Sequence, residues 1–200
     1  MAATFAIDAQ QSIEAGWTGG TERRFYDTVS STKGGYRSTY DIDRSQAHVG
    51  WQGRFEGWRG RVQAYRSEID IVNSAGNGGA ATRPRNLLDE VIDGHATVKL
   101  GGHQVTFGGE WRDETLTNAG LTTGRDSATH KALFVQDEVA LGSSLMLTGG
   151  LRADNHELFG SEVSPRAYLV WEASPALVVK GGFGHAFKAP TLKQISPNYV

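Results

Sequence analysis

The feature that most constrains this chain is a two-residue alternation of apolar and polar side chains, which recurs along most of its 200 residues. Alternate residues of a β-strand face opposite sides of a sheet, so this period predicts strands with one apolar and one polar face. In segment 128–141 the apolar face is undecided, because Leu133 and Val135 compete with Ala132 and Phe134. About nine antiparallel strands are predicted, over residues 5–17, 46–55, 58–72, 92–100, 104–112, 128–141, 145–154, 162–173 and 177–183.

The connections between these strands alternate between short and long. Short ones follow Arg54, Leu100, Leu141 and Ala173, whereas long polar stretches cover residues 18–39, 73–86 and 117–127. The connection at 157–161 is short but falls where a long one is due. Tight turns at one end and long loops at the other are typical of transmembrane β-barrels.

Composition agrees with a barrel. Only 38% of the residues are hydrophobic and the mean hydropathy is −0.39, as expected where one face of each strand lines a polar lumen. The sequence has no apolar run long enough for a transmembrane helix. A soluble antiparallel sandwich also alternates. However, strands of 12–15 residues exceed the usual five or six, and the five tryptophans lie mostly near strand ends, which favours the barrel.

The sequence offers no catalytic motif. Its six histidines show no H-x-x-x-H pairing, no G-x-S-x-G nucleophile elbow occurs, and there are no cysteines. The glycine-rich run 181–184 is followed by His185 rather than by the Lys-Ser/Thr of a phosphate loop. We therefore predict a protein that is not an enzyme and has no metal site. The net charge of −2 argues against a general nucleic-acid binder.

Four segments of the last third together carry a family resemblance. They read ALFVQDE at 132–138, LTGGLRADNH at 147–156, SPRAYLVW at 164–171 and FGHAFKAPTL at 183–192. In this order and spacing they resemble TonB-dependent outer-membrane siderophore receptors, most closely the branch with the colicin I receptor and the ferric enterobactin receptor. Residues 1–127 match the family in layout only.

The resemblance implies a transporter in the outer membrane of a Gram-negative bacterium. Such receptors fill a barrel of about 22 strands with an N-terminal plug, and they import a ferric siderophore with energy passed on by the TonB complex. Residues 1–200 would then be an all-β, antiparallel segment of that barrel, without the plug through which TonB acts and without the C-terminal strands. Iron would arrive inside the siderophore, so no resident cofactor is expected.

Three other functions stay open at this point. The motifs are shared with receptors for haem or cobalamin. A passive outer-membrane porin or adhesin barrel would show the same alternation, and a soluble β-sandwich binding module is the third alternative. Colicin or phage could use the exposed loops of any such receptor.

Two groups of residues are candidates for function. The polar faces of the strands would line the lumen and contact the plug or the solute, although a water-facing wall with paired charges is the simpler interpretation. The stretch 18–39 carries four cations against two carboxylates, together with aromatic rings, which suits an anionic, aromatic ferric catecholate; a solvated loop or a lipopolysaccharide contact is the alternative. The lumen candidates are His95, Glu110, Arg112, Arg152 and Asp154, and the ligand candidates are Arg23, Arg24, Tyr26, Tyr36, Arg37, Arg83 and Arg85.

Overall fold

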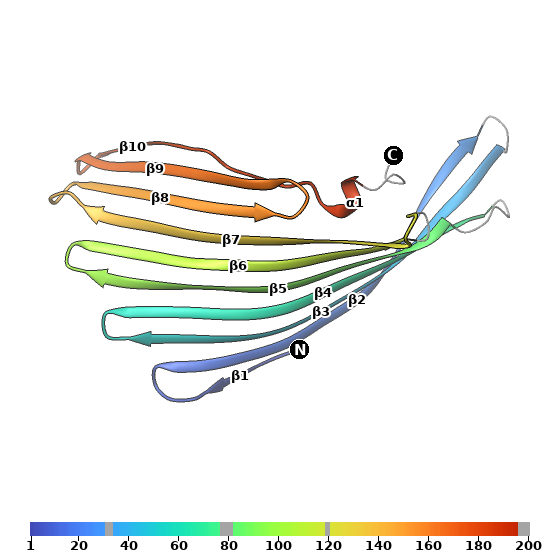
Figure 1. Ribbon diagram of the computed structural model, residues 1–200, viewed down its shortest axis with the longest axis horizontal. Coiled ribbons are helices and arrows are strands. Elements are labelled where there is room, and N and C mark those ends of the chain that lie inside the picture. Colours follow the sequence, from blue (N-terminus) through green and yellow to red (C-terminus); the bar gives the residue numbers. More distant parts are fainter. Residues whose placement is uncertain (31–33, 77–81, 119–120, 196–200) are drawn as a thin grey trace.

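The protein forms one antiparallel sheet in which each strand pairs with its neighbours in sequence (Figure 1). The computed structural model describes residues 1–30, 34–76, 82–118 and 121–195, and the side chains of Thr28, Ser30, Thr82 and Arg83 lie outside this description. Within these residues no helix is long and apolar enough to cross a membrane. The elements are β1 (Ala2–Ala6), β2 (Gln11–Ser30), β3 (Gly34–Phe55), β4 (Trp58–Ala75), β5 (Thr82–Leu100), β6 (His103–Asn118), β7 (Arg125–Ala140), β8 (Leu145–His156), β9 (Gly160–Ser174), β10 (Leu177–Gly184) and α1 (Leu192–Ile195).

The predicted all-β meander is confirmed, with one correction at its start. The single strand expected over residues 5–17 is two strands, β1 and β2, joined by a turn at 7–10. The Asp8 carboxylate makes this turn, because its Oδ1 accepts hydrogen bonds from the backbone N–H groups of Gln10 (2.7 Å) and Gln11 (2.8 Å). Aspartate favours turns through such local bonds, and the alternating residues around it hid the break.

The two ends of the sheet differ as predicted, but the long connections are shorter than expected. Tight turns at 56–57, 101–102, 141–144 and 175–176 share one end, at the left of Figure 1. In two of them Gly57 (φ 80°) and Gly101 (φ 61°) adopt the left-handed conformation that glycine tolerates. At the other end, most of the loop predicted over 18–39 is a ladder that pairs β2 with β3 as far as Ser30 and Gly34. Likewise β4 continues to Ala75 and β6 to Asn118.

Register divides the sheet into two faces. The face that we call outer carries rows of apolar neighbours, such as Ile13, Trp51 and Val62 on β2, β3 and β4. Segment 128–141 is resolved: Leu133 lies in the outer row with Gly109 and Ala153, whereas Ala132 pairs with Glu110 and Asp154 on the other, inner face. Toward the end with the long connections, the outer apolar band ends at Arg66, Glu90, Asp113, Lys131 and Asn155.

Few side chains are buried inside this single layer. A small cluster forms on the inner face beyond the apolar band, where Leu116 and Ala128 pack with Leu121 and Leu192 against the half-buried Leu87. Elsewhere the outer face leaves large apolar groups exposed, among them Leu133 (72%) and Leu151 (53%). An open layer with exposed apolar side chains requires an apolar surrounding on that side.

The two faces should respond differently to charge. In the full-length protein we expect Leu151→Arg, in the outer band of β8, to lower the free energy of unfolding in lipid by about 2–4 kcal/mol. Thr148→Arg, on the inner face of the same strand, should change it much less. Denaturant titration of both variants in lipid vesicles would measure this, and equal losses would contradict the assignment of faces.

Candidate functional site

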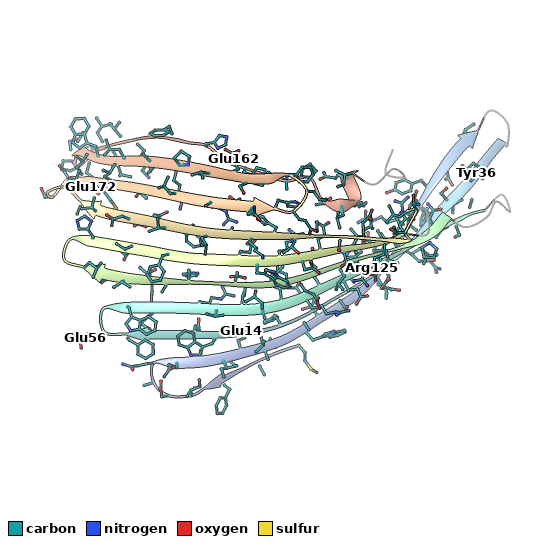
Figure 2. The ribbon with its side chains drawn as sticks, viewed as in Figure 1. Glu14, Tyr36, Glu56, Arg125, Glu162 and Glu172 are labelled. Atoms are coloured by element: carbon teal, nitrogen blue, oxygen red, sulfur yellow. The ribbon has the colours of Figure 1, made fainter. Side chains whose placement is uncertain are left out.

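The hairpin formed by the ends of β2 and β3 projects beyond the other strands (Figure 1). Its ladder runs without a register shift from Gly19, paired with Ser45, to Ser30, paired with Gly34. Figure 2 places Tyr36 on this projection, whereas Arg125 lies where the ends of the other strands converge. The hairpin is therefore a firmly built arm, not an irregular loop.

Ion pairs between and along its strands hold the charges of this arm. Glu22 accepts hydrogen bonds from Arg24 and from Arg44 Nη1 (2.7 Å). These two guanidinium groups, Arg24 first, lower the pKa of Glu22 to about 2. Arg37 forms a bidentate pair with Asp27 (2.8 and 3.1 Å) and lowers the pKa of that carboxyl. All of these groups are exposed, so each pair contributes little to stability by itself.

Register assigns the ligand candidates of the arm to opposite sides. Arg24, Tyr26 and Tyr36 continue the inner face of the sheet, and the Tyr26 ring meets Tyr40 edge-on at 5.7 Å. Arg23 and Arg37 lie on the opposite side, where Arg23 pairs with Asp41 and Arg37 stacks over the Phe25 ring at 4.7 Å. The predicted ligand group thus does not share one surface.

The second basic pair was predicted in a loop but begins strand β5. Arg85 pairs in register with Ile71 and Asn118 and continues the inner face. The side chain of Arg83 lies outside the described residues. The contact of either residue with a ligand stays a prediction.

The lumen candidates all lie on the inner face, and four of them belong to two ionic groups. His130 Nε2 lies 2.9 Å from Asp154 Oδ1. This carboxylate also accepts a hydrogen bond from Arg152 Nε (2.9 Å), and Asp154 is only 5% exposed. Glu110 lies 3.4 Å from His130 Nδ1. Separately, Arg112 donates to Asp89 (2.8 Å). His95 stands apart from both groups, beside Gly108 and Arg61 in register.

A strap formed by residues 185–195 folds back over the inner face. Its backbone leaves β10 at His185, whose N–H donates to the carbonyl of Pro165 (2.9 Å). At its far end Leu192 is buried, and its N–H donates to Glu114 Oε1 (3.1 Å). Beneath the strap lies a cavity of about 320 Å³. The lining from the wall includes Glu110, Arg112, His130, Arg152, Asp154 and His156, and the lining from the strap is Phe187–Thr191.

Sequence reasoning did not foresee this strap. The FKAPTL segment stood out only as a mark of resemblance, with no position in the fold. One signal was available: Pro190 lacks the N–H that a ladder needs, which disfavours a strand through this residue. The buried acceptor Glu114 gave no such signal, because its neighbours in sequence are polar.

A meander of long strands, apolar outside and polar inside, with tight turns at one end and projecting strands at the other, defines the wall of an outer-membrane β-barrel. The family described as "TonB dependent receptor-like, beta-barrel" matches residues 4–200, and the chain belongs to it.

Relatives of this chain occur in several Gram-negative bacteria. The chain is 34% identical over 122 residues to the iron-regulated outer membrane virulence protein of Vibrio cholerae, and 28% identical over 200 residues to the ferric enterobactin receptor of Pseudomonas aeruginosa. These alignments cover 59% and 90% of this chain, but only 19% and 26% of the relatives. The chain therefore spans about a fifth to a quarter of their length.

Solved structures show the same fold. The siderophore receptor PirA of P. aeruginosa superposes with a TM-score of 0.77 at 24% identity, over 98% of this chain and 34% of that one. The ferric enterobactin receptor mutant R480A of P. aeruginosa, solved in complex with enterobactin, gives 0.80 at 18% identity, over 99% and 34%. The relatives are receptors and transporters rather than enzymes, as predicted.

The ion pairs of the arm should be visible in its titration. We expect the Glu22 carboxyl to titrate with a midpoint of about 2, so its pairs are fully present above the ordinary pKa of 4.5 and are lost as the pH falls toward 2. In an Arg24→Gln/Arg44→Gln double variant the midpoint should return toward 4.5. Carboxyl ¹³C resonances of the labelled protein measure both, and a wild-type midpoint near 4.5 would contradict the pairing.

The strap should depend on the Glu114 carboxyl as a hydrogen-bond acceptor. Glu114→Ala leaves the buried Leu192 N–H unsatisfied, which costs about 1–3 kcal/mol, so the Leu192 amide should exchange with solvent much faster. Glu114→Gln keeps an acceptor oxygen at this position and should retain most of the protection. Hydrogen-exchange mass spectrometry over residues 185–195 tests this, and equal exchange in both variants would show that the bond does not hold the strap.

Proposed function

We propose that this chain forms part of the barrel wall of a TonB-dependent receptor that imports a ferric siderophore of the catecholate type by active transport. The observation that carries the proposal is the relationship over 90% of the chain to a protein named ferric enterobactin receptor. The plug and the TonB complex enter as features expected of the whole receptor.

The arrangement of the arm supports an anionic, aromatic ligand. Tyr26, Tyr36 and Tyr40 present rings on the side that continues the inner face, so they border the path into the barrel. Arg24 on the same side forms an ion pair with Glu22, so its charge is partly neutralised before any ligand binds. We therefore expect ring stacking to contribute more than charge to ligand recognition by this arm.

Uptake of cobalamin is the second candidate. The chain is 32% identical over 97 residues to the vitamin B12 transporter BtuB of V. cholerae, which is 47% of this chain and 16% of that protein. Family membership disfavours the porin and sandwich alternatives. Haem as the solute, and the binding of colicin or phage to the arm, stay predictions.

The test pairs two ring deletions on opposite sides of the arm. In the full-length receptor, Tyr26→Ala removes a ring that borders the inner face, and we expect the affinity for ferric enterobactin to fall about fivefold. Phe25→Ala removes a similarly exposed ring on the other side (60% against 55%) and should leave the affinity unchanged. Binding is measured by quenching of intrinsic fluorescence.

Growth separates the two candidate solutes. A strain without other siderophore receptors should grow under iron limitation on ferric enterobactin when it carries this receptor. Growth of a cobalamin-dependent strain on limiting corrinoid, with no response to ferric enterobactin, would replace the first candidate by the second.

A further inference from the structure

Three arginines gather on the inner face at the end of the sheet with the tight turns. Arg54 belongs to β3, and Arg59 and Arg61 belong to β4. Arg54 and Arg59 are partners in register, and Arg61 follows on the same face of β4, next to the outer-face residue Val62. We call these three residues the arginine cluster. Like charges directly opposite each other destabilise a sheet, so a bound anion would stabilise this arrangement.

No carboxylate of the described residues forms an ion pair with the arginine cluster. Asp8 lies nearby, but its carboxylate accepts hydrogen bonds from the backbone and side chain within its own turn. Asp93 accepts a hydrogen bond from Gln63 Nε2 (2.7 Å), and Arg61 donates to the amide oxygen of the same glutamine. Glu56 lies in the β3–β4 turn (Figure 2) and is likewise in no ion pair of the described residues.

The arginine cluster differs in this respect from other arginines of the inner face. Three arginines nearer the long connections are paired with carboxylates: Arg24 with Glu22, Arg112 with Asp89 and Arg152 with Asp154. Their charge is therefore partly neutralised within the wall, whereas that of the cluster is available to a ligand. The cluster also lies at the end with the tight turns, which in such barrels faces the periplasm.

The arginine cluster borders a cavity of about 490 Å³, a volume within the range of small-molecule sites. Ser12, Gln52 and His95 line it together with the three arginines, and the turn between β1 and β2 contributes residues 8–11. His95 pairs in register with Arg61, so this cavity includes the lumen candidate that stands apart from the two ionic groups. Its lining offers several cationic and neutral hydrogen-bond donors around one carboxylate that is already bonded.

We propose that the arginine cluster is an exit site for the ferric catecholate at the periplasmic end of the barrel, an inference that rests on the proposed function. A ferric tris-catecholate is a trianion with aromatic rings. A guanidinium group is planar and permanently charged, and it both pairs with anionic oxygens and stacks on aromatic faces. The cluster therefore offers the charge pairing that the arm, with its neutralised arginines, does not.

The test uses the full-length receptor in lipid nanodiscs, where both ends of the barrel are accessible to solute. A fluorophore attached through Gln10→Cys reports from the lining of the cavity. The same fluorophore attached through Ser143→Cys reports from the β7–β8 turn, at the same end of the sheet but outside the lining. Ferric enterobactin is the probe, because the iron complex quenches a nearby fluorophore.

Three double variants are compared in the background of the label at position 10. Arg54→Gln/Arg59→Gln removes two charges of the cluster, and Arg54→Lys/Arg59→Lys keeps the charges but removes the planar donors. The matched control is Lys99→Gln/Lys180→Gln, which removes two charges of the inner face at the same end, outside the lining of the cavity.

We expect ferric enterobactin to quench the label at position 10 strongly and the label at position 143 weakly. The half-saturating concentration should rise about tenfold in Arg54→Gln/Arg59→Gln, rise less in Arg54→Lys/Arg59→Lys, and stay unchanged in the lysine control. Gallium enterobactin has the same charge and no unpaired electrons, so it should displace the ferric complex and restore the fluorescence. The unfolding temperature of Arg54→Gln/Arg59→Gln should not fall, because the change relieves opposed like charges.

Three results would overturn the exit site. The first is an equal half-saturating concentration in the arginine-to-glutamine variant and the lysine control. The second is a lower unfolding temperature in the arginine-to-glutamine variant alone, which would show that the cluster is bound to a carboxylate elsewhere in the receptor. The third is a wild-type receptor that imports ferric enterobactin without quenching at position 10, and this result would leave the proposed function standing. Failure of import itself would overturn the proposed function, on which the exit site rests.

Discussion

The continuous backbone ladder is the constraint on which everything else in this protein depends. In a hydrocarbon surrounding, each unpaired N–H or C=O is expensive, so strands must be hydrogen-bonded on both sides through the membrane. The ladder also fixes register, and a slip of one residue would turn every apolar side chain inward. Only two register shifts occur among the described pairs, near Ile71 and at Leu177, and both lie at strand ends.

Much of this could be predicted from the sequence, because alternation is a property of each strand alone. The strands, the two faces and the short turns follow from residues that neighbour each other in the chain. The break at Asp8 could not be predicted, because apolar residues keep the same two-residue spacing on both sides of it. The faces of 128–141 needed the partner strands, because only pairing of Ala132 with Glu110 and Asp154 shows that it belongs inside.

The candidate site was predictable in its members but not in its geometry. Polar composition between residues 18 and 39 suggested a loop, whereas cross-strand partners such as Asp41 for Arg23 make it a ladder. These carboxylates form ion pairs with the same arginines that composition alone had suggested as ligand contacts. On the wall, Asp154 gathers His130 and Arg152 across neighbouring strands, and this favours the simpler interpretation of paired charges. The strap over the inner face depends on a contact between Glu114 and Leu192, which lie 78 positions apart, and local pattern carries no trace of it.

The long β2–β3 ladder has an energetic consequence for capture of a solute. A flexible loop of this length would lose conformational entropy on closing around a ligand, roughly 1–2 kcal/mol for each backbone residue that becomes fixed. In this arm hydrogen bonds fix the backbone before any ligand binds. The conformational entropy is therefore lost during folding and not during binding. If the proposed function holds, rings such as Tyr26 and Tyr40 meet the solute on a surface that is formed before binding. Association should therefore be limited by diffusion and orientation rather than by rearrangement of the arm.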